Sequence, residues 1–196
     1  MNRINLAGEV LTAPTYSHEC KGEVFYSFDI KAFRKSGAFD VIKCIAAEIF
    51  SKNITEGSLI NVFGEIRTRN VKDEQEKSHM QIFVFVLELN EYDGDINSVQ
   101  IEGTLCKPTS IRSTPTGRDI ADLLIASNRI SMHKSDYLPC VAWGRNALRA
   151  SEMVVGNKLK AVGRLQSRNY TKALPSGEYE VKTAYEVSIG IIEEVY

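Results

Sequence analysis

The chain has 196 residues, of which 43% are hydrophobic and 25% are charged. These proportions are those of an ordinary globular protein and exclude a disordered, collagen-like or coiled-coil chain. Lysine and arginine total 24 against 25 aspartate and glutamate residues, giving a formal net charge of −1. Because the chain has no basic excess, any anionic partner has to be held by a local patch.

The sequence carries no recognisable targeting or metal signal. The opening MNRINLAGEV lacks a basic stretch followed by a long apolar run, and no 18-residue apolar stretch follows. We therefore expect neither secretion nor membrane insertion, and a cytoplasmic location. The four cysteines are widely spaced without a CxxC pair, which favours neither a zinc site nor a disulfide scaffold. No cofactor is implied.

In chain order, the first predicted strand has a counterpart in the second half of the chain. Asn2–Val10 matches Asn97–Leu105, and both segments alternate apolar and polar residues as half-buried strands do. A repeat that carries its own strand pattern indicates a domain duplicated in tandem.

The next elements also occur twice. Second strands are predicted at roughly Phe25–Phe33 and Ile120–Ser127, and third strands at Asp40–Ala46 and Asp136–Ala142. Each third strand leads into a short helix that we expect to end at a glycine C-cap. The expected buried helix faces are Ala46, Ile49, Phe50 and Ile54 in the first copy, and Ala147, Ser151 and Val154 in the second.

The fourth strands give the best match, with Gly57–Asn70 over Gly156–Asn169, and a polar turn and a last strand close each copy. The order of elements predicts an all-β fold of two tandem five-stranded OB-fold barrels, each with a short helix between strands 3 and 4. We expect domains at residues 1–93 and 97–196, with Glu91–Asn97 as a short linker. We also expect no continuous sheet across that linker.

The residues give little support to an enzyme. The three histidines lie in polar, turn-like stretches and are not spaced for a metal ion. No GxSxG, GxxxxGK[ST] or GxGxxG pattern occurs, and the adjacent acidic residues lie in a tail or a hairpin turn. We therefore predict that the chain is not an enzyme.

The second repeat combines rings and cations, as single-strand binding requires, because bases stack on rings while cations follow the phosphates. Val41, Ala47 and Val71 occupy the matching ring positions of the first repeat. Residues through Asp93 include 11 basic and 14 acidic side chains, and the remainder 13 and 11. The candidate nucleic-acid-binding residues are the rings Tyr137, Trp143 and Tyr170 and the cations Arg69, Arg129, Lys134, Arg145, Arg168 and Lys172.

Two of these assignments have structural alternatives. A single tryptophan at a strand-to-helix turn, such as Trp143, often serves as a packing anchor. Arg69 and Arg168 occupy equivalent positions, which indicates either a shared ion pair that supports the fold or a shared phosphate contact. Both explanations remain open at this stage.

Several segments resemble the bacterial single-stranded DNA-binding protein family. GSLINVFGEIRTRNVKD resembles that family's fourth strand and hairpin, and CVAWGRNA followed by GNKLKAVGRLQSRNYTK resembles the same region in a second copy. NRINLAGEVLTAP resembles the first strand. In that family DNA wraps over rings on the third strand, after it and after the fourth strand, places that Tyr137, Trp143 and Tyr170 take by motif match.

The resemblance also implies an assembly. Most members have one barrel per subunit and form tetramers, whereas a few carry two barrels and dimerise, so we expect a homodimer. We expect the family's disordered, acidic-tipped tail to be missing, because the sequence stops at IGIIEEVY. The first barrel's empty ring positions predict that it serves as an assembly surface.

We therefore predict a protein that binds single-stranded DNA without sequence preference, mainly through its second barrel. Its expected setting is DNA replication, repair or recombination, with replication or repair proteins as possible partners and no membrane. The alternative is an OB-fold structural or adaptor subunit, primosome-like or part of a mobile-element replication system, that mainly binds proteins.

Overall fold

The structure is a computed structural model of the chain and describes residues 1–72, 76, 78–129, 133–173 and 177–195. Within this described part, no helix is long and apolar enough to cross a membrane. The first half contains β1 (Asn2–Val10), β2 (Thr15–Cys20), β3 (Glu23–Phe33), β4 (Phe39–Ala47), α1 (Glu48–Ser51), β5 (Leu59–Lys72) and β6 (Ser78–Asn90). The second contains β7 (Asn97–Leu105), β8 (Ser110–Ser113), β9 (Asp119–Arg129), β10 (Lys134–Trp143), α2 (Arg145–Glu152), β11 (Lys158–Ala173) and β12 (Tyr179–Val195).

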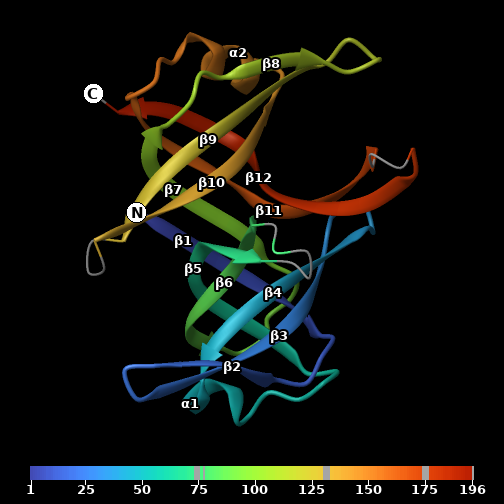
Figure 1. Cartoon of the computed structure of the whole chain (residues 1–196), viewed down its shortest axis with the longest axis vertical. Helices are drawn as coiled ribbons and strands as arrows, with labels where there is room; N and C mark the ends of the chain where they lie inside the picture. Colours follow the sequence, from blue (N-terminus) through green and yellow to red (C-terminus); the bar gives the residue numbers. More distant parts are fainter. Residues whose placement is uncertain (73–75, 77, 130–132, 174–176, 196) are drawn as a thin grey trace.

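Each half closes on itself as a five-stranded barrel, which confirms the all-β prediction. In the first half β1 pairs with both β3 and β5, and the parallel pairing of β4 with β6 completes the ring. In the second half β7 pairs with β9 and β11, and β10 runs parallel to β12. Figure 1 shows the first barrel below and the second above, with the β11–β12 hairpin reaching out to one side.

The structure adds one strand to each half that the sequence did not predict. β2 and β8 pair with the outer edges of β3 and β9. Their side chains are exposed or half-buried throughout, because neither strand faces the core. An edge strand of this kind lacks the alternation of apolar residues on which strand prediction depends.

The helix predictions were partly wrong. α1 spans only four residues, and Ile49, expected on its buried face, is 74% exposed. In α2 the buried residues are Ala147 and Ala150, whereas Ser151 is exposed. Val154 lies after the end of the helix and is exposed as well. The glycines expected to cap the helices belong to the turns before the next strands. Gly57 and Gly156 have φ values of 80° and 98° there.

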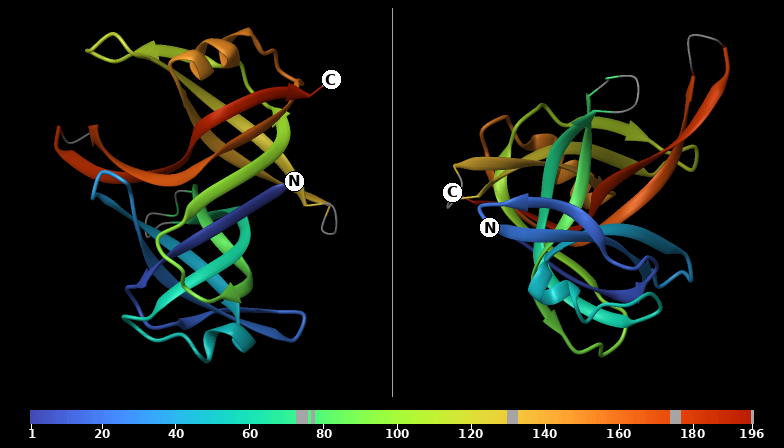
Figure 2. Two further views of the ribbon diagram at one scale, coloured as in Figure 1. Left: turned by 180° about the vertical axis from the view of Figure 1, so that it is seen from behind. Right: turned by 60° about the horizontal axis from the view of Figure 1, so that its bottom comes forward.

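The two barrels share one hydrogen-bonded sheet, so the expectation of separate sheets was wrong. β1 and β7 run antiparallel, with Asn2 opposite Ile101 and Leu6 opposite Asn97. All twelve described strands are thereby connected in one order. Each barrel leaves an open edge on its first strand, and pairing the two equivalent edges satisfies both sets of backbone groups. The two strands lie side by side where the barrels meet (Figure 2).

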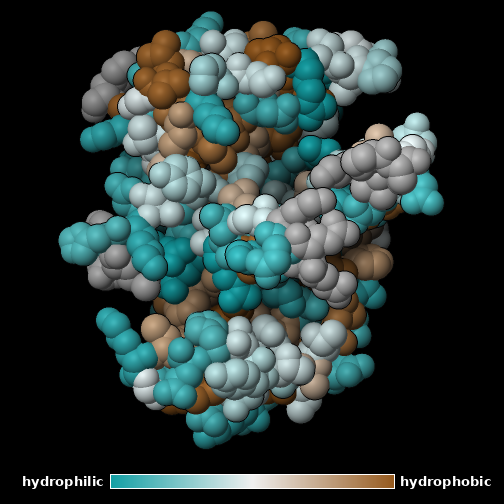
Figure 3. Space-filling view, in the orientation of Figure 1, coloured by the Kyte–Doolittle hydropathy of each residue, from teal (hydrophilic) through white to brown (hydrophobic). Residues whose placement is uncertain are grey.

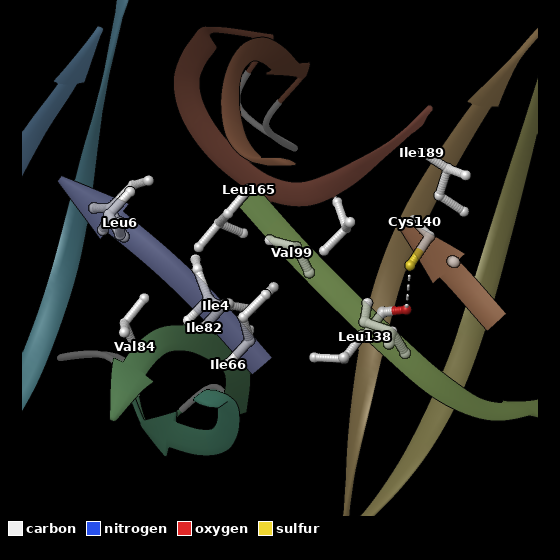
Figure 4. Close-up of a cluster of buried hydrophobic side chains, with 14 of the residues drawn as sticks. Ile4, Leu6, Ile66, Ile82, Val84, Val99, Leu138, Cys140, Leu165 and Ile189 are labelled. Carbon is white, nitrogen blue, oxygen red and sulfur yellow. Dashed lines mark hydrogen bonds between the residues drawn. The ribbon is translucent and has the colours of Figure 1, made fainter. Parts of the chain in front are cut away.

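The same pairing joins the two interiors. Buried residues of both barrels form one apolar cluster that runs through the β1–β7 junction. Ile4 and Ile66 come from the first barrel, and Val99 and Leu165 from the second. Figure 4 shows these side chains gathered around the neighbouring strands β1 and β7. The barrels are therefore held together by packing as well as by backbone hydrogen bonds.

Gly64 of β5 and Gly163 of β11 occupy equivalent positions in the two barrels. Each follows a bulge in the pairing with the last strand of its barrel. A Cβ added at Gly64 would lie 2.2 Å from the carbonyl oxygen of Phe85, and one at Gly163 would lie 2.2 Å from that of Ser188. Only glycine allows the backbones to approach this closely.

We predict that Gly163→Ala lowers the free energy of unfolding by about 1–3 kcal/mol, because the new methyl group forces two backbones apart. Gly190→Ala is the matched control on the partner strand, since its Cβ would lie 3.7 Å from the nearest atom, the Val162 oxygen. Urea unfolding followed by circular dichroism measures both. Equal stability of the two variants would contradict the predicted clash.

Candidate nucleic-acid interface

The three candidate rings lie on two strands of the second barrel. Tyr137, near the start of β10, is 49% exposed, and Tyr170, on β11 beyond the barrel body, is 39% exposed. Trp143 ends β10 and is half-buried, with the Arg118 guanidinium 5.4 Å from its ring centroid. Tyr137 and Tyr170 are therefore exposed, whereas Trp143 is partly covered by its neighbours.

The predicted cations differ in how exposed their side chains are and in whether a carboxylate already holds them. Lys134, at the start of β10, and Arg145, at the start of α2, are exposed. Arg168 donates from Nε to Glu186 at 3.0 Å, yet half of its side chain remains accessible and its guanidinium lies 5.8 Å from the Tyr170 ring centroid. Lys172 belongs to β11, and its side chain lies outside the described part.

Arg129 is not a free phosphate ligand, which corrects its assignment to the interface. Its guanidinium forms a two-pronged ion pair with Asp136, whose side chain is 1% exposed. It also donates to the Thr68 carbonyl oxygen of the first barrel at 3.3 Å. Arg129 is 14% exposed and serves the contact between the barrels. The sequence could not show this because Asp136 and Thr68 meet it only in the folded structure.

The alternatives for Arg69 and Arg168 can now be separated. Cys44 pairs with Val84 and Cys140 pairs with Val187, so Phe83 stands where the second barrel has Glu186. Arg69 accordingly lies 5.3 Å from the Phe83 ring and donates to Gln81 at 2.8 Å. The two arginines do not share an ion pair. Arg69 is exposed and stays a candidate cation.

The first barrel carries rings that the sequence comparison missed. Phe33 and Phe39 are a cross-strand pair at the β3–β4 turn, 40% and 51% exposed, with centroids 6.3 Å apart. The Lys31 ammonium lies 4.9 Å and 5.0 Å from these two ring centroids. The sequence prediction considered the first-repeat positions that match the rings of the second repeat. Phe33 and Phe39 lie at other positions and were therefore missed.

A second aromatic group covers the outer face of β3, β4 and β6. Phe25, Phe83, Ile45 and Ala47 are buried together there, with Phe85 packed against them. The Arg67 guanidinium lies 3.5 Å from the Phe85 ring centroid. Arg67 also forms an ion pair with Glu65, so this arginine combines a ring contact with a carboxylate partner.

The barrels are also joined by two equivalent carboxylate clusters. Asp40 of β4 is fully buried and accepts hydrogen bonds from the Ser167 backbone N–H at 2.6 Å and from its hydroxyl at 2.9 Å. Arg34 donates to Asp40 and, at 2.7 Å, to the Ser167 carbonyl oxygen. Asp136, Thr68 and Arg129 repeat this arrangement with the roles of the barrels exchanged.

Burial by itself raises the pKa of Asp40, but the hydrogen bonds from Arg34 and Ser167 outweigh it and hold that pKa below its usual value. The hydrogen bond with Asp40 raises the pKa of the Arg34 guanidinium. This cluster is therefore ionised at neutral pH.

Nothing in the described residues indicates a reactive centre. They contain no group of three or more side chains suited to hold a metal ion. Cys44 and Cys140 are buried in equivalent positions, and burial raises the pKa of both thiols, so neither is activated.

Figure 3 shows that the face where the barrels meet is mainly hydrophilic, while apolar side chains gather near the top end.

A closed five-stranded barrel with a helix between its third and fourth strands is an OB-fold. This chain has two such barrels and is therefore an OB-fold protein. The family model described as "Single-strand binding protein family" matches residues 96–193. This match covers half of the chain, and the chain belongs to the single-strand binding protein family.

Individual relatives agree with this assignment. The chain is 36% identical over 81 residues to Single-stranded DNA-binding protein A of Bacillus subtilis (strain 168), covering 38% of this chain and 47% of that protein. It is 29% identical over 160 residues to the Single-stranded DNA-binding protein of Thermus aquaticus, covering 71% of this chain and 60% of that protein. The alignments therefore span about half of each relative's length.

The fold has a counterpart among solved structures. The crystal structure of wild-type single-stranded DNA binding protein from Thermus aquaticus superimposes with a TM-score of 0.78 at 23% sequence identity. The superposition covers 100% of this chain and 93% of that one. This likeness establishes the fold over the whole chain, including the first barrel.

We predict that Asp40→Asn lowers the free energy of unfolding at pH 7 by about 1.5–3 kcal/mol, the range for hydrogen bonds to a charged group. The folded pKa lies below the unfolded value of about 3.9. The carboxylate therefore stabilises the fold fully above that value, and the stabilisation disappears as the pH falls through the folded pKa. The difference between variant and wild type should accordingly shrink in acid.

Urea unfolding at a series of pH values measures this difference. Asp122→Asn is the control, because Asp122 pairs with Arg112 on the exposed surface and such pairs contribute little. If the difference between Asp40→Asn and wild type stays constant down to about pH 2, the lowered pKa of Asp40 is contradicted.

Proposed function

We propose that the chain binds single-stranded DNA without sequence preference and acts in DNA replication, repair or recombination. The observation that carries this proposal is the presence of two exposed rings on a barrel of the single-strand binding protein family, Tyr137 on β10 and Tyr170 on β11, with the Arg168 guanidinium beside the Tyr170 ring. Stacking on such rings needs no particular base, because every base has a flat face. Relatives named single-stranded DNA-binding proteins support the proposal.

The interface we propose has a major and a minor part. The second barrel supplies Tyr137, Trp143 and Tyr170, with Lys134, Arg145, Arg168 and Lys172 as phosphate ligands. On the first barrel, Phe33 and Phe39 with Lys31 form a smaller binding site, which also combines rings with a cation, and Arg69 adds a second cation. The first barrel thus also contributes to binding.

The remaining properties follow from the same proposal. Residues 1–93 and 97–196 are two domains, one for each closed barrel. The chain acts in the cytoplasm, carries out no catalysis and needs no cofactor. Replication or repair proteins are its expected partners. The adaptor alternative is less well supported, because the rings and cations of the second barrel suit a nucleic acid better than a protein surface.

We predict that alanine at Tyr137, Trp143 or Tyr170 weakens binding of a poly-thymidine oligonucleotide by about 1–3 kcal/mol each, the range for one lost stacking ring. Fluorescence anisotropy of a labelled oligonucleotide measures the affinity. The slope of log affinity against log salt should be about −0.7 for each phosphate contact. Binding that ignores salt would favour the adaptor function.

Tyr16→Ala is the control for ring removal. Tyr16 is 64% exposed on β2, at the end of the first barrel farthest from the second. Phe33→Ala should weaken binding less than Tyr137→Ala, because Phe33 belongs to the smaller binding site on the first barrel. If the triple alanine variant of the second barrel folds and binds like the wild type, this interface is wrong.

We further propose that two chains form a homodimer with four barrels. Val162 and Ile191 support an interface on β11 and β12, because they are opposite one another and 39% and 53% exposed. A second chain packed on this face would remove both side chains from water, which is favourable.

Sedimentation at micromolar concentration should give twice the chain mass of 21.9 kDa, and Ile191→Lys should shift the protein toward the monomer. Val154→Lys is the matched control, since Val154 is 65% exposed in the loop after α2. A wild-type monomer would disprove the dimer without affecting the DNA-binding proposal.

A further inference from the structure

The junction between the barrels touches the exposed ring on β10 directly. Thr68 of β5, in the first barrel, accepts a hydrogen bond through Oγ1 from the backbone N–H of Tyr137 at 3.3 Å. The same hydroxyl donates to Asp136 at 3.2 Å, and the Thr68 N–H donates to that carboxylate at 2.6 Å. The backbone that carries the ring is thus fixed by a residue of the other barrel.

Every polar group of Thr68 is used in this contact. Its carbonyl oxygen accepts from Arg129, whose guanidinium is held by Asp136. Asp136 is 1% exposed, so its hydrogen bonds are shielded from water and confine the strand strongly. The ring of Tyr137 nevertheless points out of this buried network, with 49% of the residue exposed.

At the equivalent junction, the residue that matches Tyr137 has no ring. Ser167 of β11 makes the matching hydrogen bonds to Asp40, and Arg34 donates to its carbonyl oxygen. The residue after Asp40 is Val41, which offers no flat face for a base. The two clusters share their chemistry, but the residue that follows the aspartate is a candidate stacking ring only at Asp136, whereas at the other cluster the ring, Phe39, precedes Asp40.

We propose that Thr68 and Asp136 are positioning residues for strand binding: through the Tyr137 backbone, the first barrel fixes the stacking ring of the second. This inference rests on the proposed binding of single-stranded DNA and deepens it. A base that stacks on Tyr137 gains more from a ring that is already fixed, because less freedom is lost on binding. The two barrels consequently form one DNA-binding surface at this point.

A double-mutant cycle on the full chain tests the proposal. Thr68→Val keeps the shape of the side chain but removes the hydroxyl from both hydrogen bonds. We expect it to weaken poly-thymidine binding about twofold to tenfold, the equivalent of one lost hydrogen bond. In a Tyr137→Ala background the same change should have almost no effect, because the ring it positions is gone.

Two further variants separate positioning from a general structural role. Thr68→Ser restores the hydroxyl and should restore the affinity. Ser167→Ala removes the matching hydroxyl from the other junction and should show no coupling to Tyr137→Ala. Equal weakening by Thr68→Val with and without the Tyr137 ring would overturn the proposal, as would wild-type affinity of Thr68→Val.

A measurement on the unmutated protein makes the test independent of variant folding. Adding the oligonucleotide should slow hydrogen exchange at the Thr68 and Tyr137 amides together. Protection confined to Tyr137 would overturn the coupling. If the wild type does not bind the oligonucleotide at all, the proposed function itself fails, an outcome distinct from binding without coupling.

Discussion

The antiparallel pairing of β1 with β7 is the constraint on which the rest of the structure depends. It joins two closed barrels through their equivalent first strands and places Asn2 opposite Ile101. Once these strands are paired, β4 lies against β11 and β10 against β5, so each buried aspartate meets a hydroxyl residue of the other barrel. The pairing itself uses backbone groups, and the shared apolar cluster and the two aspartate clusters add side-chain contacts to it.

The duplicated frame supports two different surfaces. Equivalent positions carry Glu186 in the second barrel and Phe83 in the first, and the neighbouring arginines adapt: Arg168 forms an ion pair, whereas Arg69 lies over a ring. Buried positions are constrained by the shared core, as with Cys44 and Cys140. Outward positions differ between the barrels: the second has an exposed ring at Tyr137, and the first has the Phe33–Phe39 pair.

Much of the fold could be predicted from the sequence, because the barrel strands alternate between core and solvent. β1 and β7 begin and end at the predicted residues. The edge strands β2 and β8 could not be predicted, since they do not face the core. The β1–β7 pairing and the inward role of Arg129 were also missed. The strand pairing and the Arg129–Thr68 hydrogen bond join residues more than 60 positions apart. The ion pair of Arg129 with Asp136 is local, but its inward role follows from the burial of Asp136, which the fold produces.

The same distinction explains which site residues the sequence could identify. A ring at a repeated position, such as Tyr170, stands out by comparison of the two halves, whereas Phe33 and Phe39 gain their meaning only from the cross-strand contact and from Lys31. A cation's role is harder still to predict, because a guanidinium can hold a phosphate or a buried carboxylate equally well. Arg129 and Arg168 carry the same charge, and it is the exposure of their side chains, 14% against 50%, that leaves only Arg168 open to a phosphate.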